Sequence, residues 1–196
     1  QFDCDVNVAL FRVAARVALG GRNVPEGVVR RQAQALKSSK LDWNELYDEG
    51  PVYRPYVQPG GPPAILVDID GTLAHNDGHR GWYDYTKVYG DLVKEEIADI
   101  VRIYDREDYF IIVMSGREDS CKAETIRWLS DNGIPFDKIH MRKAGDQRKD
   151  SIVKMELFDE HVRDGYDVAF VLDDRNQVVD AWRSIGLTCL QVAPGD

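Results

Sequence analysis

From residue 64 onward, short apolar runs alternate with stretches in which apolar residues recur every three or four positions. Short runs rich in β-branched residues predict buried strands, and the longer spacing predicts amphipathic helices. The predicted strands cover residues 64–67, 109–114, 136–141, 168–172 and 188–192. The predicted helices cover residues 93–104, 123–129, 151–162 and 178–185. Such alternation is typical of an α/β fold with a Rossmann-like, mostly parallel sheet and helices on both faces.

The first 60 residues follow a different pattern. Residues 2–6 could form a strand and residues 8–19 a helix, and Pro25 suits the first turn of a second helix that runs on to Leu36. The segment from Gly50 to Pro63 is dense in proline and glycine, which marks a boundary. We therefore expect a helical part with its linker over residues 1–60 and an α/β domain over residues 61–196.

The composition narrows the setting in which this protein works. Of its 196 residues, 43% are hydrophobic, and no apolar run has the length of a membrane span or forms a secretory signal. The three cysteines are far apart and odd in number, which favours reduced thiols in a cytoplasmic protein. A net charge of −9 argues against broad binding to duplex nucleic acid but allows a site that grips one phosphate-bearing end. The chain begins with Gln1, so we expect a fragment or a processed product.

Polar side chains stand where three of the predicted strands end. They are Asp68 and Asp70 after the first strand, Ser115 and Arg117 after the second, and Asp173 and Asp174 after the strand at 168–172. In a parallel sheet these ends can lie side by side, so carboxylates, a hydroxyl and a guanidinium would converge. Hard oxygen ligands suit Mg²⁺, and phosphoryl transfer needs a metal, positive donors, a nucleophile and a proton donor. Taken singly, each group could instead be an ordinary turn or an acidic loop.

The order of these groups resembles the four motifs of the haloacid dehalogenase superfamily. The motifs are Asp68-Ile69-Asp70-Gly71-Thr72, Ser115, Lys154 and the pair Asp173-Asp174. Over residues 64–196 the chain more closely resembles the phosphatase domain of the bacteriophage-type polynucleotide kinase/3′-phosphatase. The stretches that carry this resemblance are Ser115-Gly116-Arg117-Glu118, Met141-Arg142, residues 145–150, Val153-Lys154 and residues 173–179.

The resemblance implies a role for each of these residues. Asp68 would attack phosphorus and form an aspartyl-phosphate, while Asp70 would protonate the leaving sugar oxygen and then deprotonate the attacking water. The residues implied to hold Mg²⁺ are Asp68, Asp70 through its backbone carbonyl, and Asp174, with Asp173 close by. Ser115 and Lys154 would hold the phosphoryl oxygens. The residues implied to contact phosphate or nucleic acid are Thr72, Arg80, Arg117 and Arg142, and the spacing from Asp70 to Arg80 differs by one residue from the family pattern.

Two of the basic residues also have a plainer explanation. Lys154 lies near Glu156 on a predicted helix, so it could belong to a solvated helix face. Arg142 follows a short strand and could be an ordinary surface residue. The sequence alone leaves both interpretations open.

The polar and aromatic residues that follow the first motif are ambiguous in the same way. His75 and His79 lie in one polar loop and are more simply solvated than bound to a metal. Trp82, Tyr83 and Tyr85 could stack on a nucleic-acid base, or they could pack their loop onto the domain. Packing is the simpler interpretation.

The spacing of the motifs leaves little room for a cap domain over the site. One helix and one strand use most of the interval from Thr72 to Ser115, and a helix and a short strand use that from Arg117 to Arg142. An uncovered site admits a polymer end, whereas a capped site favours small molecules. We therefore expect a Mg²⁺-dependent phosphatase that hydrolyses 3′-phosphate ends of DNA or RNA. A nucleoside monophosphate phosphatase and a non-catalytic binding module of the same fold are the alternatives.

The first 60 residues resemble the last part of a P-loop polynucleotide kinase domain. The resemblance rests on residues 2–6, Arg12, Arg16, Arg22 and residues 28–32. The phosphate-binding loop G-x-x-x-x-G-K-[ST] is absent from this chain, so this piece should carry no kinase activity. The resemblance implies an upstream kinase domain in a two-activity end-healing enzyme, and an unrelated helical appendage is the alternative.

Overall fold

The computed structural model describes residues 25–31, 53–81 and 83–195 of the chain. The chain divides into two compact units, Gln1–Gly50 and Pro51–Asp196. In the first unit, residues 26–31 form a short helix, as Pro25 at its start predicts. The strand and helix predicted over residues 2–19 lie outside the described residues. Among the residues that are described, no helix has both the length and the apolar character to cross a membrane.

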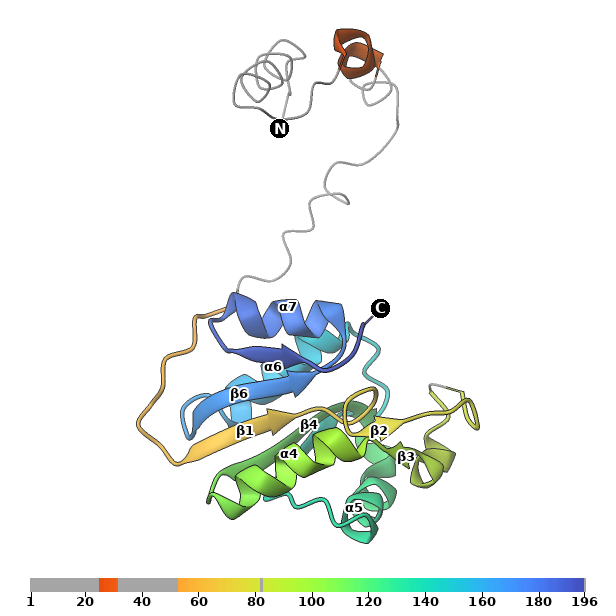
Figure 1. Ribbon diagram of the computed structural model, residues 1–196, viewed down its shortest axis with the longest axis vertical. Coiled ribbons are helices and arrows are strands. Elements are labelled where there is room, and N and C mark those ends of the chain that lie inside the picture. Colours follow the sequence, from red (N-terminus) through yellow and green to blue (C-terminus); the bar gives the residue numbers. More distant parts are fainter. Residues whose placement is uncertain (1–24, 32–52, 82, 196) are drawn as a thin grey trace. The chain divides into compact units, whose positions relative to one another are not determined.

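The second unit is built on a five-stranded parallel sheet with the strand order β5-β4-β1-β6-β7 (Figure 1). The strands are β1 (Pro63–Val67), β4 (Phe110–Glu118), β5 (Lys138–Arg142), β6 (Asp167–Asp173) and β7 (Cys189–Gln191). In the register of β1, Leu66 lies beside Ile112 of β4 on one side and Val171 of β6 on the other. All five strands expected from the apolar runs are confirmed, and β1 lies at the centre of the sheet.

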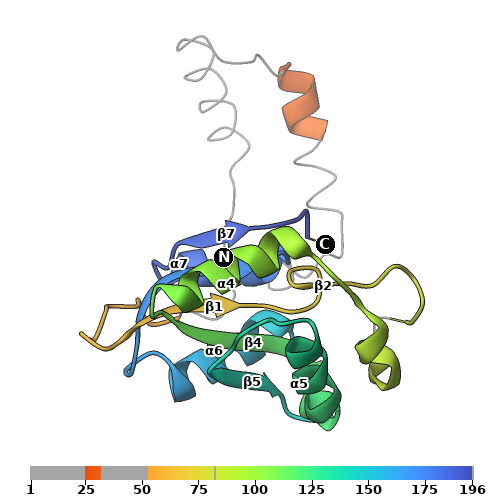
Figure 2. The ribbon, with the colours of Figure 1, turned by 60° about the horizontal axis from the view of Figure 1, so that its bottom comes forward.

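Helices cover both faces of this sheet, as the alternating pattern predicts. They are α4 (Glu95–Arg106), α5 (Lys122–Asp131), α6 (Asp150–His161) and α7 (Asn176–Ser184). Successive side chains of a strand point to opposite faces. Accordingly, Ile65 of β1 packs in one buried cluster with residues of α4 and α5, whereas Leu66 packs in a second cluster with residues of α6 and α7. Figure 2 shows α4 lying across one face of the sheet.

A small insert separates β1 from α4. It contains β2 (Ala74–His75), the 3₁₀ helix η1 (Tyr85–Gly90) and β3 (Leu92–Val93), and β2 pairs with β3 in antiparallel fashion. Strands of two residues are too short for apolar periodicity to reveal, so the sequence predicts none of these elements. Within the described residues the domain carries no large cap, which confirms the expectation from motif spacing.

Residues 53–60, which the sequence assigns to the linker, belong to the second unit and contact its α/β part. The Tyr56 hydroxyl donates to the carbonyl oxygen of Tyr166 at 2.7 Å and accepts from the backbone N–H of Val168 at 2.9 Å. The backbone N–H of Gly60 donates to the Asp167 carboxylate at 2.9 Å. These contacts hold the segment against the start of β6.

Candidate active site

The carboxyl ends of β4, β1 and β6 lie next to one another, because these strands are neighbours in the sheet. Asp68 directly follows β1, and its backbone N–H donates to the carbonyl oxygen of Leu172 in β6 at 3.0 Å. Asp173 is the last residue of β6, and Asp174 follows it. The carboxylate oxygens of Asp68, Asp173 and Asp174 come within 4.8 Å of one another. The strand ends expected to converge therefore do so.

Lys154 is the cation within this acidic cluster. Its Nζ lies 2.7 Å from Oδ1 of Asp68 and donates to Oδ2 of Asp173 at 2.8 Å. Burial alone would lower the pKa of Lys154, but Asp173 and Asp68 outweigh it and raise that pKa above its usual range. The Lys154 side chain is only 1% exposed, so the alternative of a solvated helix face is wrong. A charged ammonium is thus fixed beside the Asp68 carboxylate.

The buried carboxylates of this cluster repel one another. Burial raises the pKa of Asp68 well above its usual value; Lys154 opposes this rise, and the neighbouring Asp173 adds to it. Burial and Asp173 also raise the pKa of Asp174. A divalent cation among these oxygens would relieve the repulsion. Carboxylate oxygens are the donors that Mg²⁺ prefers in proteins, so this set of residues fits that ion.

Asp173 is more heavily engaged than its two acidic neighbours. Besides Lys154, its Oδ2 accepts from Trp182 Nε1 at 3.3 Å, and its Oδ1 accepts from the backbone N–H of Arg175 at 3.3 Å. It is also only 1% exposed, whereas Asp174 is half-buried. This arrangement suits Asp173 to holding Lys154 in place and leaves Asp174 better placed to offer a ligand oxygen.

The turn after β1 depends on Gly71. Its φ of +83° lies in the left-handed region that favours glycine. A Cβ atom at this position would lie 2.0 Å from Oδ2 of Asp174, a distance that no side chain tolerates. The Gly71 N–H donates to the carbonyl oxygen of Ala74 at 2.9 Å and closes the turn. Glycine therefore lets the turn that carries Asp70 approach Asp174 closely.

Asp70 belongs to a second cluster, in which two carboxylates and two guanidiniums balance in charge. Asp70 accepts two bonds from Arg117, at 2.7 and 2.8 Å, and one from Arg80 at 2.8 Å. Arg80 also donates twice to Asp91, at 2.7 Å each time, and Arg117 donates to Asp91 as well. Trp128 Nε1 donates to the Asp91 carbonyl oxygen at 2.7 Å. Asp91 thus fixes the positions of the two arginine side chains that bind Asp70.

The charge state of Asp70 follows from these contacts. Burial would raise the pKa of Asp70, but hydrogen bonds and charge from Arg117 and Arg80 outweigh it and lower that pKa. The side chain remains 26% exposed, so it can be reached from solvent. Arg117 is 1% exposed, and its Nη1 has no hydrogen-bond partner among the described residues. A buried donor without a partner is costly, so this atom is suited to receive an anionic oxygen.

A third cluster lies where β4 passes the start of α6. β4 continues through the Ser115-Gly116-Arg117 stretch with a shift in its register against β5. A Cβ atom on Gly116 would lie 2.2 Å from Asp150 Oδ1, so only glycine fits there. Asp150 accepts from Arg142 Nη2 at 2.8 Å and from Arg175 Nη1 at 3.2 Å.

Arg142 is buried, so the alternative of an ordinary surface residue is wrong. In addition to Asp150, its guanidinium donates to the carbonyl oxygens of Gly116, Asp146 and Arg148, at distances of 2.8 to 2.9 Å. It therefore ties together β4, the 146–148 loop and the start of α6. Direct contact of Arg142 with phosphate stays a prediction, and its present bonds suit it to positioning the loops around the site.

Two hydroxyl groups expected to contact phosphate lie at the edges of this region. Ser115 is fully buried at the end of the apolar part of β4, and its Oγ accepts from the backbone N–H of Arg117 at 3.2 Å. Thr72 is also fully buried, and its Oγ1 has no partner among the described residues. Both side chains keep donor capacity that a phosphoryl group could use.

The structure distinguishes between the two interpretations for most of the ambiguous residues of the insert. His75 and His79 are exposed, and neither belongs to a carboxylate or imidazole cluster that could hold a metal among the described residues. Tyr85 packs against the core, as expected. Tyr83 is 85% exposed, so the packing interpretation is wrong for it. Trp82 lies outside the described residues.

Sequence reasoning gave no role to Asp91 or Asp150. Asp91 has no flanking motif, and Asp150 ends the 145–150 stretch without a role of its own. Some of their partners are distant in sequence, since Arg117 lies 26 residues from Asp91 and Arg175 lies 25 residues from Asp150. Arginines that follow predicted buried strands could have indicated such partners, because a buried guanidinium requires a carboxylate. That requirement does not say which of the 34 acidic residues supplies it.

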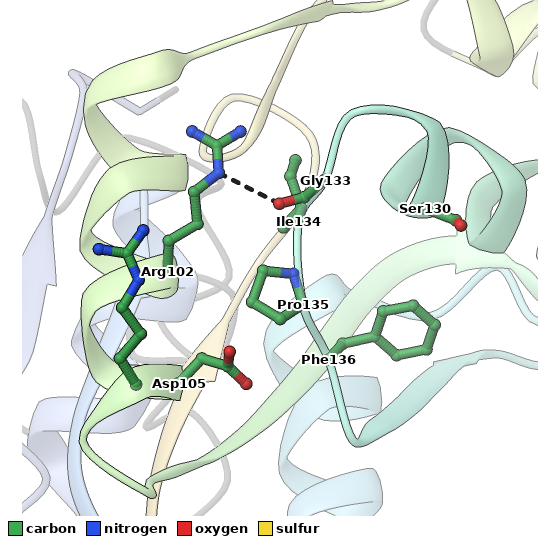
Figure 3. A pocket seen from close by; sticks show the side chains of 8 residues that line it. Arg102, Asp105, Ser130, Gly133, Ile134, Pro135 and Phe136 are labelled. Carbon is green, nitrogen blue, oxygen red and sulfur yellow. Dashed lines mark hydrogen bonds between the residues drawn. The ribbon is translucent and has the colours of Figure 1, made fainter.

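A hollow of about 530 Å³ lies elsewhere on the domain, between the end of α4 and the turn after α5 (Figure 3). Arg102, Arg106, Pro135 and Phe136 help to line it, and Arg102 Nε donates to the carbonyl oxygen of Gly133 at 3.1 Å. Because α4 runs back across the sheet, this hollow lies toward the amino ends of the strands. It is therefore separate from the clusters around Asp68 and Asp70.

The parallel sheet and the paired aspartates after its central strand define a phosphatase of the haloacid dehalogenase type. A class C acid phosphatase from Bacillus anthracis, solved with tungstate bound, shares the fold at 18% identity and a TM-score of 0.50, over 86% of this chain and 73% of that chain. The family model for the polynucleotide kinase PNKP phosphatase domain matches residues 62–196. The chain belongs to this family.

Three similar proteins are each longer than the part that this chain matches. A "Putative bifunctional polynucleotide kinase/RNA ligase" of Autographa californica nuclear polyhedrosis virus is 34% identical over 166 residues, which make up 82% of this chain and 22% of that protein. A chain in the structure of the Pnkp1/Rnl/Hen1 RNA repair complex is 33% identical with a TM-score of 0.70, over 100% of this chain and 64% of that chain. A chain in a second Pnkp1/Rnl/Hen1 complex is 38% identical with a TM-score of 0.70, over 76% of this chain and 51% of that chain. This chain therefore spans less than two thirds of each relative.

Proposed function

We propose that this chain is the phosphatase part of an end-healing enzyme and that it uses Mg²⁺ to remove 3′-phosphates from DNA or RNA ends. The observation that carries the proposal is the position of the Asp68 carboxylate, which lies between the Lys154 ammonium and the acidic pair at the end of β6. Membership in the polynucleotide kinase phosphatase family supports a nucleic-acid substrate. The absence of a large cap over the described part of the site supports a polymer end rather than an enclosed small molecule.

Asp68 is the nucleophile in this proposal. Its carboxylate attacks phosphorus, the bond from phosphorus to the 3′ oxygen breaks, and an aspartyl-phosphate forms on Asp68. Water then attacks the same phosphorus atom, which releases inorganic phosphate and restores the carboxylate. Lys154 holds positive charge beside the reacting oxygens throughout.

The metal would bind at the same edge of the sheet. Mg²⁺ would be held by Asp68, the Asp70 backbone carbonyl and Asp174, with Asp173 beside them. When bound, it supplies positive charge for the phosphate oxygens and for the carboxylates that otherwise repel one another.

Asp70 is the proton carrier. Arg117 and Arg80 keep it ionised in the free site, which is the form that accepts a proton from the attacking water. An incoming phosphate dianion competes for the same two guanidiniums. Their weakened hold on Asp70 lets its carboxylate take up a proton from solvent, and Asp70 then passes that proton to the leaving 3′ oxygen. One side chain can then serve first as acid and later as base.

The remaining residues hold the phosphoryl group and the strand end. Ser115 and Thr72 supply hydroxyl donors, and Arg117 supplies the unpartnered Nη1. Contact of Arg80 with phosphate is part of the proposal, and in the free site this buried residue is bonded to Asp70 and Asp91. Arg142 acts on the same region by fixing the loop and the Asp150 carboxylate.

A comparison of substrates tests this function. The enzyme should release phosphate from a 3′-phosphorylated oligonucleotide with a kcat/KM at least about tenfold above that for free 3′- or 5′-mononucleotides, because the open site can bind the rest of the strand. Chelation of Mg²⁺ with EDTA should abolish the reaction, and added Mg²⁺ should restore it. A preference for free mononucleotides would instead identify a nucleoside monophosphate phosphatase. Loss of all turnover in active-site-intact protein would identify a binding module.

The proposal also includes a kinase half upstream of this chain. It is supported by the resemblance of residues 1–60 to the end of a P-loop kinase domain and by the relative whose printed name includes polynucleotide kinase. A G-x-x-x-x-G-K-[ST] motif in the reading frame before Gln1 is the expected result. A cytoplasmic setting is part of the same proposal, and the free, buried thiols of Cys121 and Cys189 agree with it.

A further inference from the structure

Tyr83 is the most exposed large apolar side chain in the described part of the chain, with 85% of its surface in solvent. The two other tyrosines of the insert are committed elsewhere. Tyr85 packs against the core, and Tyr89 donates to Asp131 at 2.6 Å while the Arg127 guanidinium lies 4.7 Å from the centre of its ring. An aromatic ring gains free energy when a flat partner covers it. Among the described tyrosines of the insert, Tyr83 is therefore the one whose ring is open to a ligand.

The segment that carries Tyr83 is held at two positions, Arg80 and Asp84. Three residues earlier, Arg80 is buried and bonded to Asp70 and Asp91. One residue later, the Asp84 N–H donates to the Gly81 carbonyl oxygen at 3.0 Å, and the Asp84 side chain caps the first turn of η1. The exposed ring is thus presented from a defined turn, at the edge of the cluster that contains Asp70.

Arg175 directly follows Asp174, so its guanidinium belongs to the Asp68 side of the site. Arg175 is bonded to Asp150 at 3.2 Å and its side chain is 43% exposed. Arg175 therefore offers a partly exposed positive charge beside Asp68, while Tyr83 of the insert lies three residues after Arg80, which is bonded to Asp70.

We propose that Tyr83 stacks on a base of the single-stranded polynucleotide end whose 3′-phosphate lies at Asp68. This inference rests on the function proposed above and gives its substrate class a specific contact. Every base has a π face, so the contact would strengthen binding of DNA and RNA ends without reading their sequence. A free phosphate ester without a base cannot use it. The ring would thereby favour polynucleotide ends over small phosphate esters.

The test compares Tyr83→Ala, Tyr83→Phe and a matched control, Tyr89→Ala, on two substrates. One is a single-stranded 3′-phosphorylated oligonucleotide, and the other is glycerol 2-phosphate, which has no aromatic group. We expect Tyr83→Ala to lower the ratio of kcat/KM for the oligonucleotide to that for glycerol 2-phosphate by about fivefold to 150-fold, the range of base–aromatic stacking. The loss should appear mainly in KM. Tyr83→Phe keeps the ring and Tyr89→Ala removes a ring bound to α5, so both should leave the ratio within about twofold of wild type.

A third substrate separates stacking from other effects. For an oligonucleotide with abasic sites in its last two positions, the kcat/KM of the wild type should fall by the same factor as Tyr83→Ala loses on the intact oligonucleotide. Tyr83→Ala should show no further fall in kcat/KM on this abasic substrate. A ratio unchanged in Tyr83→Ala would overturn the stacking contact and leave Tyr83 as a surface for some other macromolecule. A parallel fall on both substrates would also overturn it, because the ring would then only support the insert. Failure of the wild type to dephosphorylate any 3′-phosphorylated oligonucleotide would instead refute the proposed function itself.

Discussion

At the scale of single residues, Arg117 joins the two carboxylates of the second cluster. It is held by Asp70 and Asp91 while one of its nitrogens remains without a partner among the described residues. A guanidinium with two fixed edges and one open nitrogen is pre-organised, because little side-chain entropy is lost when an anion arrives. The same residue thus controls the charge of Asp70 and offers a donor to phosphate.

Replacement of Arg117 by alanine should therefore weaken turnover strongly. Charge-assisted hydrogen bonds are worth about 1.5–3 kcal/mol, so kcat/KM for a 3′-phosphorylated oligonucleotide should fall by about tenfold to 150-fold in Arg117→Ala. Steady-state kinetics measures the loss. Arg127→Ala is the matched control, because Arg127 is exposed on α5 and pairs only weakly with Asp131 at 3.4 Å. Equal rates for Arg117→Ala and wild type would mean that Arg117 does not contact substrate.

At the scale of elements, the sequence is informative wherever periodicity is long enough. The strands of the sheet and its four helices follow from apolar runs and helical spacing, because both faces of a parallel sheet are buried. β2, β3 and η1 could not be foreseen, since two-residue strands carry no period. The same limit applies to the site. Asp68, Asp173 and Asp174 lie at strand ends, which topology brings together, whereas the partnership of Asp91 with Arg80 and Arg117 depends on the unforeseen insert.

The contact of β5 with α6 makes the stability of the domain depend on pH. His140 of β5 stacks on His161 of α6 with ring centres 4.2 Å apart and planes inclined by 13°. Burial, then the nearby His161, Lys122 and Lys138, lower the pKa of His140 to about 4. The unfolded chain, with an ordinary histidine pKa of about 6.5, binds the proton more readily. Stability from this group is therefore complete above about pH 6.5 and declines as the pH falls toward 4.

Replacement of His140 should flatten this dependence. Between pH 6.5 and 4.5, the free energy of unfolding should fall less in His140→Gln than in wild type, by about 1–2 kcal/mol once partial exposure of the ring is allowed for. Urea unfolding at several pH values measures the difference. The exposed His75 is the control position, and His75→Gln should keep the wild-type slope. Parallel curves for His140→Gln and wild type would show that the stacked pair does not titrate in this way.

At the scale of the whole domain, the candidate site lies at the carboxyl ends of the parallel strands. The strands are parallel, so their carboxyl ends meet and the loops that follow them share one crevice. Although Lys154 lies among these carboxylates, burial and their mutual repulsion raise the pKa of Asp68 and that of Asp174. Folding therefore positions the Asp68 cluster at a cost that a bound metal would offset.

Mg²⁺ should accordingly stabilise the folded protein. A ligand that binds only the native state at about ten times its Kd adds about 1.4 kcal/mol, which corresponds to a rise in melting temperature of about 3–6 °C for a domain of this size. Thermal unfolding with Mg²⁺ and with NaCl of matched ionic strength measures the specific part of this rise. Asp174→Asn removes a charge and a ligand oxygen, so its response to Mg²⁺ should be much smaller. An equal rise in both proteins would place the metal elsewhere.

The claim on which the account depends is that the Asp68 carboxylate is the nucleophile. The most direct measurement is the single-turnover rate of phosphate release from a 3′-phosphorylated oligonucleotide by Asp68→Asn in Mg²⁺, with wild-type folding confirmed by circular dichroism. Asparagine keeps the shape of the side chain but replaces the nucleophilic carboxylate with a neutral, weakly nucleophilic amide, so the rate should fall by at least about 10³-fold. Release by Asp68→Asn at a rate within tenfold of wild type would contradict the account.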